Sequence, residues 1–146
     1  FVVLFFGLVA VGCTYYVQAG TLTAEVLLLA LACGGLVNNI LVVNNYRDVA
    51  EDAAAGKRTL VVRFGRRAAR CQYLLAGVFA TGVLCWLCWR GVSAGILLGL
   101  LPSTYSVLLA GRLSQAVAPG DFLRALQGAA QVVAAFGLLC ALGLLL

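Results

Sequence analysis

Asp48 and Asp52 are two carboxylates four residues apart, and this spacing places side chains one above the other on a helix face. The chain contains no His, and no Cys lies near the pair. Carboxylates without nitrogen or sulfur ligands favour a hard cation. Mg²⁺ fits, because it takes one or two carboxylates and fills its remaining positions with water and phosphate. We therefore predict Asp48 and Asp52 as catalytic, metal-binding residues with Mg²⁺ as the cofactor.

A basic turn follows the two acids. Lys57 and Arg58 come directly after Gly56, and their cationic side chains can neutralise phosphate oxygens. Gly56 allows the backbone to turn closely past such a group, because glycine readily adopts a positive φ. The acids and the basic turn together predict half of a diphosphate–Mg²⁺ site.

The elements that must position this site are strongly apolar. The chain has 146 residues, of which 64% are hydrophobic and only 10% charged. Water-soluble domains carry about 25% charged residues, so a soluble fold is excluded. Apolar runs of about 20 residues are typical of membrane-spanning helices. We predict an all-α, polytopic transmembrane helix bundle with five spans: Phe1–Gln18, Leu22–Val43, Cys71–Trp89, Val92–Gly111 and Leu123–Leu146.

The distribution of basic residues predicts the orientation. If the spans alternate, residues 44–70 and 111–122 connect helices on the same side of the membrane. Nine of the ten basic residues lie in or beside these two connections, and Arg90 alone lies at the opposite side. The positive-inside rule then places the 44–70 loop in the cytoplasm. The bases sit beside the membrane, so no nucleic acid is expected; those in RFGRRAAR (63–70) are also compatible with simple anchoring to anionic lipid.

The acids continue a polar stripe that enters the second span. On a continuous helix, Asn38, Asn45, Asp48 and Asp52 fall within an arc of roughly 80°. Polar groups at membrane depth normally face the bundle interior or a wet cavity. For Asn38 and Asn39 two readings remain open: they line a cavity, or they bond a neighbouring helix.

The stretch NNYRDVAEDAAAGKRTLVVRFG (Asn44–Gly65) closely resembles the second Asp-rich motif of the UbiA superfamily of intramembrane prenyltransferases. The motif has the form DxxxD followed by a glycine-containing loop, matched by Asp48, Asp52 and Gly56. The GKRTL portion and FFGLVAVGCTYYVQ (Phe5–Gln18) are most similar to the 1,4-dihydroxy-2-naphthoate prenyltransferases of menaquinone biosynthesis. The resemblance implies that residues 1–146 are helices five to nine of a nine-helix fold, the C-terminal part of a single transmembrane prenyltransferase domain with 44–70 as its cytoplasmic motif loop.

The resemblance also implies an activity. The full-length protein is expected to transfer a polyprenyl group from polyprenyl diphosphate to 1,4-dihydroxy-2-naphthoate, giving demethylmenaquinone, within the lipid bilayer of a bacterial cytoplasmic membrane. Asp48 and Asp52 would hold Mg²⁺ on the diphosphate. The residues implied to bind or support the diphosphate are Asn44, Asn45, Arg47, Lys57, Arg58 and Arg63. Tyrosines could line the chamber for the allylic cation. The candidates are Tyr15, Tyr16, Tyr46 and Tyr105, with ordinary packing favoured for the last two.

The chain departs from the family pattern in one respect. The superfamily's first Asp-rich motif, of NDxxDxxxD type, does not occur here, and the sequence contains no Met. We therefore expect this chain to be the C-terminal part of a larger protein and to be inactive alone. Alternatives are another aromatic acceptor, such as 4-hydroxybenzoate, homogentisate or a chlorophyllide, or a non-enzymatic membrane transporter or assembly subunit.

Overall fold

The computed structural model describes all residues, 1–146, and it is all-helical. A π-helix, η1 (Val3–Cys13), continues into α1 (Thr14–Ala19). The remaining elements are α2 (Ala24–Arg47), α3 (Val49–Ala54), α4 (Leu60–Trp89), the 3₁₀-helix η2 (Ala94–Gly99), α5 (Leu100–Leu113) and α6 (Pro119–Leu145). The predicted all-α fold class is therefore confirmed.

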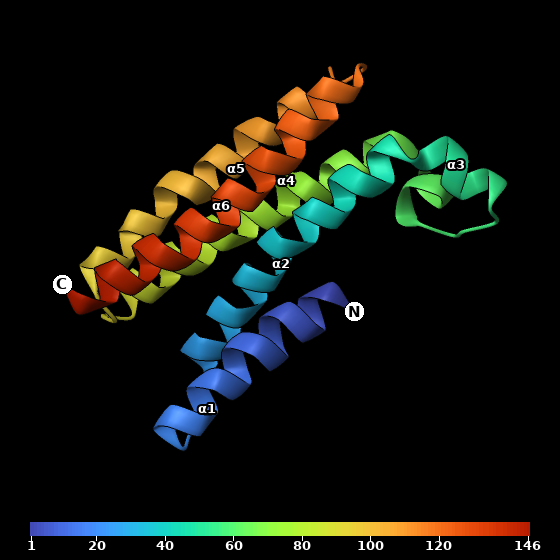
Figure 1. Cartoon of the computed structure of the whole chain (residues 1–146). Coiled ribbons are helices and arrows are strands. Elements are labelled where there is room, and N and C mark those ends of the chain that lie inside the picture. Colours follow the sequence, from blue (N-terminus) through green and yellow to red (C-terminus); the bar gives the residue numbers. More distant parts are fainter.

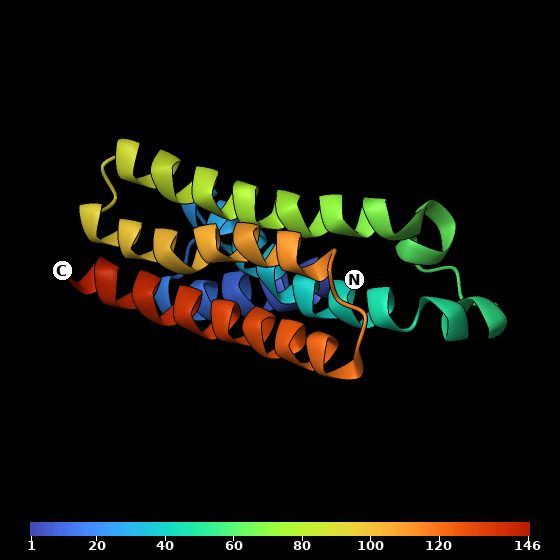
Figure 2. The same cartoon turned by 90° about the horizontal axis from the view of Figure 1, so that it is seen from above.

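Four long helices form the bundle (Figures 1 and 2). Helix α2 packs against α4 and α6, and α5 packs against the same two helices from the other side. Helix η1 packs along α2, where Gly7 and Gly34 let the two backbones approach closely. The buried core includes Leu36 of α2, Leu84 of α4 and Phe136 of α6.

The number of long spans differs from the prediction of five. Four helical segments are long and apolar enough to cross a membrane: Ala24–Arg47, Leu60–Trp89, Ala94–Leu113 and Pro119–Leu145. The helix at the start of the chain, Val3–Ala19, is shorter. It ends at Gly20, whose φ of 70° leaves the right-handed helical region. The first predicted span is thus helical, but shorter than the other four.

The predicted loop at 44–70 is mostly helical. Thr59 caps α4, because its hydroxyl accepts a hydrogen bond from the Val62 N–H, and arginine is a good helix former. Helix α4 therefore begins at Leu60, well before the predicted start of the third span at Cys71. Gly65 interrupts it with φ 80° and ψ 173°. The basic residues after Gly65 belong to the helix that enters the bundle, which corrects the predicted loop boundary.

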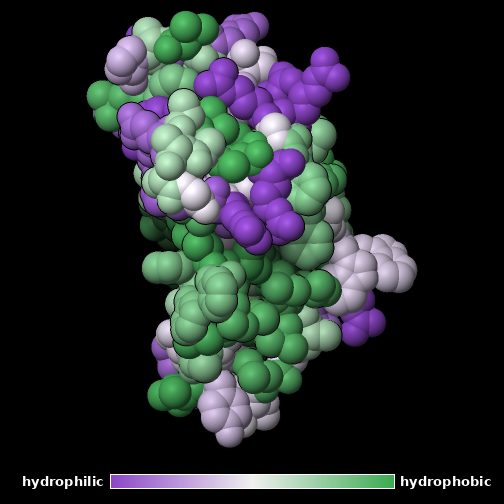
Figure 3. Space-filling view, turned by 90° about the vertical axis from the view of Figure 1, so that its right-hand side faces the viewer, coloured by the Kyte–Doolittle hydropathy of each residue, from purple (hydrophilic) through white to green (hydrophobic).

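The connections alternate as predicted. Helix α3 and the α5–α6 connection lie at one end of the molecule, and the α4–η2 turn lies at the other (Figures 1 and 2). Hydrophilic residues gather at the α3 end, whereas a hydrophobic surface covers the middle of the face shown in Figure 3. This face of the bundle is therefore apolar in the middle and strongly polar at one end.

Candidate functional site

The two predicted metal-binding acids lie where α2 gives way to α3. Asp48 has φ −91° and ψ 15°, so regular helix geometry breaks at this residue. The backbone hydrogen bonds nevertheless continue: the Asp48 N–H donates to the Asn44 carbonyl at 2.9 Å, and the Asp52 N–H donates to the Asp48 carbonyl at 2.8 Å. The continuous helix assumed for the polar stripe is therefore bent at its first acid. We name residues 47–59 the acidic segment.

Asp52 is the more enclosed of the two acids. Only 5% of the residue is exposed, and its Oδ1 lies 2.7 Å from Lys57 Nζ. The same two residues are also joined through the backbone, because the Lys57 N–H donates to the Asp52 carbonyl at 2.8 Å. Gly56 makes this turn possible with a φ of 70°. The predicted glycine turn thus brings a lysine onto a buried carboxylate.

The Lys57 ammonium lies in a negative field. Its hydrogen bond to Asp52 raises its pKa, and the charges of Asp48 and Glu51 add to this effect. Its side chain is 64% exposed. Lys57 is therefore a firmly protonated cation that can still reach another anion from solvent.

Asp48 pairs with the residue before it. Arg47 donates two parallel hydrogen bonds to the Asp48 carboxylate, from Nε at 2.6 Å and from Nη2 at 2.9 Å. These bonds hold the pKa of the Asp48 carboxyl below its ordinary value, and the positive charge of Lys57 acts in the same direction. Both acids consequently have a cation in contact.

The structure brings together four of the predicted site residues: Arg47, Asp48, Asp52 and Lys57. The side chains of the other four form no hydrogen bond or ion pair with the acids. Asn44 and Asn45 are half-buried and make no side-chain hydrogen bond, while Arg58 and Arg63 are exposed and form no ion pair. Arg63 instead lies 5.8 Å from the ring centroid of Phe64.

Asn39 bonds neighbouring helices, which is one of the two alternatives open for Asn38 and Asn39. Its buried Nδ2 donates to the Tyr73 carbonyl at 3.2 Å and to the Ser106 hydroxyl at 3.3 Å. Asn39 therefore joins α2 to α4 and α5. Its Oδ1 is buried without a partner within this chain, and the half-buried Asn38 side chain makes no hydrogen bond.

The candidate wall tyrosines are spread over the molecule. Tyr15 and Tyr16 lie in α1, at the opposite end from α3 (Figure 1). Tyr46 is buried, with the Arg66 guanidinium 5.1 Å from its ring centroid and the Phe122 ring 6.3 Å away. Sequence reasoning missed this Arg66–Tyr46 contact, because it depends on how α4 is turned relative to α2.

The donor set defines what metal chemistry is available. No group of three or more His, Cys, Asp or Glu side chains in the structure is arranged to hold a metal ion. Two carboxylates do not form a complete protein cage for any metal. They fit Mg²⁺ that is bound jointly by protein and by phosphate, since Mg²⁺ keeps several of its non-protein ligands.

Comparison with known proteins identifies the family to which the sequence is similar. The model of the UbiA prenyltransferase family matches residues 1–126. A 1,4-dihydroxy-2-naphthoate octaprenyltransferase of Haemophilus influenzae is 38% identical over 93 residues, covering 64% of this chain and 30% of that protein. The Escherichia coli protein of the same name is 46% identical over 69 residues, covering 47% of this chain and 22% of the relative.

A third protein of that name, from Mycobacterium tuberculosis, is 46% identical over 84 residues, covering 57% of this chain and 28% of the relative. The chain thus matches less than a third of the length of each of these relatives. No solved structure shows a significant match.

Proposed function

Because the chain belongs to the UbiA prenyltransferase family, we propose that the protein containing it transfers a polyprenyl group from polyprenyl diphosphate to 1,4-dihydroxy-2-naphthoate. Diphosphate is released and the product is demethylmenaquinol, the hydroquinone form of demethylmenaquinone. The family membership supports a prenyl transfer. The naphthoate acceptor is taken from the names of the relatives in three bacterial species. The prenyl group replaces the carboxylate of the acceptor, which leaves as CO₂.

One observation carries the proposal: a buried carboxylate, Asp52, is held against an exposed lysine at the polar end of an apolar bundle. A buried carboxylate is costly unless it is paired. Lys57 forms an ion pair with Asp52. Because its side chain reaches solvent, Lys57 can exchange the Asp52 carboxylate for a phosphate oxygen. Asp48 is paired in the same way with Arg47. The site thus balances its own charges and has both charge types available for a diphosphate.

We assign Asp48 and Asp52 as the residues that hold Mg²⁺ together with the diphosphate. When bound, Mg²⁺ stabilises negative charge on the departing diphosphate. Lys57 and Arg47 neutralise phosphate oxygens once their ion pairs with Asp52 and Asp48 are broken. Asn44, Asn45, Arg58 and Arg63 lie within a few residues of these groups, and we propose that they complete the diphosphate contacts. The apolar bundle excludes water from the allylic carbon as its bond to oxygen breaks.

We further propose that the protein lies in a bacterial cytoplasmic membrane, with the acidic segment on the cytoplasmic side. Nine of the ten basic residues lie at the α3 end of the chain. The remaining one, Arg90, lies 3.3 Å from Glu25, so its charge is offset locally. The excess of basic residues at the α3 end, nine against one, supports this orientation.

The experiment that tests the proposal is a prenyl-transfer assay on membranes containing the protein expressed from its complete reading frame. Asp48→Asn and Asp52→Asn should each lower the rate by about 10²-fold, the scale for loss of a transition-state electrostatic contact. Glu51→Gln is the matched control, because Glu51 is an exposed acid in the same turn and forms no ion pair. Activity that survived both Asp substitutions would contradict the site assignment.

Two comparisons in the same assay sharpen the proposal. Replacing dihydroxynaphthoate by 4-hydroxybenzoate should abolish product formation, and equal use of both acceptors would overturn the acceptor assignment. Purified residues 1–146 alone should form no product, because half of the diphosphate site is expected to lie outside this chain. Turnover by these residues alone would contradict that expectation.

A further inference from the structure

A groove between α5 and α6 shares no residue with the acidic segment. Its upper part, of about 480 Å³, lies at the polar end and is lined by Arg112, Asp121 and Arg124 among others. Its lower part, of about 240 Å³, continues towards the opposite end of the molecule. Tyr105 and Gln131 line both parts, so the two cavities lie next to each other between the same two helices, and we call them together the α5–α6 groove.

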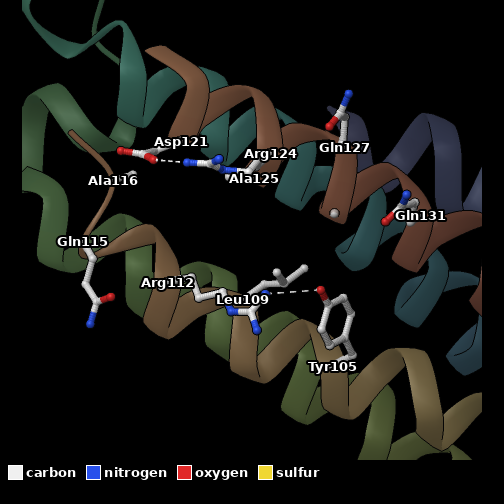
Figure 4. Close-up of a pocket in the computed structure, with 11 residues that line it drawn as sticks. Tyr105, Leu109, Arg112, Gln115, Ala116, Asp121, Arg124, Ala125, Gln127 and Gln131 are labelled. Atoms are coloured by element: carbon white, nitrogen blue, oxygen red, sulfur yellow. Dashed lines mark hydrogen bonds and ion pairs between the residues drawn. The ribbon is translucent and has the colours of Figure 1, made fainter. Parts of the chain in front are cut away.

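The upper part carries a cation without a carboxylate partner. Arg112 forms no ion pair; its guanidinium lies 5.9 Å from the Tyr105 ring centroid and 3.5 Å from the Tyr105 hydroxyl (Figure 4). On the facing helix, Arg124 is bound to Asp121 at 2.7 Å through one nitrogen. Asp121 is already engaged, because it also accepts the N–H groups of Val117 and Ala118. The groove therefore has a net positive head region suited to a single phosphate.

The lower part is apolar. Apart from the two shared residues, it is lined by Leu101, Pro102, Val132, Ala135 and Leu139. Arg112 and Leu101 are eleven residues apart on one continuous helix, which corresponds to about 16 Å along its axis. That length matches one leaflet, since the hydrocarbon core of a bilayer is about 30 Å thick. A ligand with a phosphate at Arg112 would run its hydrocarbon chain down this groove to the middle of the membrane.

We propose that the α5–α6 groove binds an anionic phospholipid from the leaflet at the α3 end, with its phosphate at Arg112 and Arg124 and one acyl chain along the lower part. A basic pocket between membrane helices is the usual receptor for an anionic lipid headgroup. A prenyl diphosphate fits this groove less well, because the head region has no free pair of carboxylates for a diphosphate-bound cation. The groove therefore differs in chemistry from the acidic segment.

Native mass spectrometry of the complete protein in detergent tests this proposal. The lipids are phosphatidylglycerol and phosphatidylcholine, added at equal concentration to the wild type and to three variants. Arg112→Gln removes the unpaired cation, and Ala135→Phe fills the acyl-chain part of the groove. Arg67→Gln is the matched control, because Arg67 is an exposed arginine at the same end of the molecule that lines neither cavity. Thermal melting of each variant tests whether the fold is retained.

The wild type should retain phosphatidylglycerol in preference to phosphatidylcholine. Arg112→Gln should weaken phosphatidylglycerol binding about tenfold, the scale of one hydrogen bond to a charged group, and Ala135→Phe should also weaken it. Arg67→Gln should leave binding unchanged. Equal retention of the two lipids, unaltered binding in Arg112→Gln, or no bound lipid in the complete protein would overturn the proposal.

Competition separates the remaining sources of phosphate. Inorganic phosphate and farnesyl diphosphate should fail to displace phosphatidylglycerol at matched concentration. Displacement by inorganic phosphate would show a simple anion site that does not use the hydrocarbon chain. Displacement by farnesyl diphosphate, abolished in Arg112→Gln, would make the groove a binding site for the prenyl substrate. Either result would overturn the assignment to a phospholipid.

Discussion

The helix bundle and the acidic segment are held together by different forces. In the bundle, η2 and α6 meet at Gly95 and Gly143, whose backbones are in contact and leave no room for a Cβ atom. In the acidic segment, α3 rests on two ion pairs, and both cations, Arg47 and Lys57, are exposed to solvent. The bundle is therefore fixed by steric fit, whereas the acids of the acidic segment are held by contacts that another charged group can replace.

This difference suits a site that must be stable when empty and open to a charged ligand. The Arg47–Asp48 pair lies at the surface, where ion pairs typically contribute about 0–1 kcal/mol to stability. Exchanging this pair for phosphate therefore opposes ligand binding only weakly. Close packing between helices is lost at a greater cost, because a packed interface has no alternative arrangement. Substitutions in the two regions should consequently change different properties of the protein.

The largest effect is expected from Gly95→Leu in the bundle. Any side chain at this position meets the backbone of Gly143, so η2 and α6 must separate. We expect a loss of about 1–3 kcal/mol in the free energy of unfolding, as for other overpacked sites. Thermal melting in detergent measures it. Gly82→Leu is the control, because Gly82 lies in α4 with open space around it; an equal loss in both variants would contradict the role of close packing.

The next effect belongs to the acidic segment. Lys57→Ala should lower prenyl transfer about tenfold, since it removes one charge-assisted phosphate contact. The melting temperature should fall only slightly, because the buried Asp52 carboxylate loses its cation while the exposed Lys57 side chain makes its one hydrogen bond to Asp52. Lys57→Arg should restore much of the activity, because it keeps the positive charge. A lowered melting temperature with unchanged activity would assign the Lys57–Asp52 pair to structure alone.

A smaller change in stability is expected from Asn39→Ala. The variant loses two hydrogen bonds between helices, to Tyr73 and to Ser106, and bonds of this kind contribute about 0.6 kcal/mol each in membrane proteins. The melting temperature should fall slightly while the acidic segment keeps its ion pairs. Asn38→Ala provides the control because the Asn38 side chain is half-buried and makes no hydrogen bond. If Asn38→Ala were the more damaging change, the assigned roles of the two residues would be reversed.

The smallest effect concerns pH. Because the Arg47 hydrogen bonds lower the pKa of Asp48, the stability from this pair is present above the ordinary Asp pKa of about 3.9. It is lost only as the pH falls through the lowered pKa. The Arg47–Asp48 pair should therefore be unaffected between about pH 5 and 9. NMR titration of the labelled Asp48 carboxyl should give a midpoint below that of Arg47→Gln, and identical midpoints would argue against the contact.

The sequence predicts the bundle better than it predicts the ends of the helices. Long apolar runs identify the membrane helices because burial in lipid requires them. The start of α4 is missed because the arginines after Gly65 suggest a solvated loop, yet they favour a helix once Thr59 caps it. The bend at Asp48 is also missed. The four-residue spacing of the acids is the same in a straight helix and in one that bends while its backbone hydrogen bonds continue.

In the candidate site, features that are local in sequence are likewise more predictable than contacts between helices. The Asp52–Gly56–Lys57 turn is predictable, because the glycine, the acid and the base lie within six residues. The partners of Asn39 and the Arg66–Tyr46 contact are not, because they depend on how α4 and α5 are rotated against α2. Local chemistry is therefore visible in this sequence, whereas contacts between helices require the packed structure.

Hydrogen exchange of the complete protein, with and without Mg²⁺ and a polyprenyl diphosphate, tests the central claim most directly. The account predicts new protection of the amides in residues 47–59, because a ligand that replaces the two ion pairs orders the acidic segment. It also predicts unchanged exchange at Gly95 and Gly143 in the bundle, and no new protection in Asp52→Asn. Protection confined to the α5–α6 groove, or equal protection in Asp52→Asn, would contradict it.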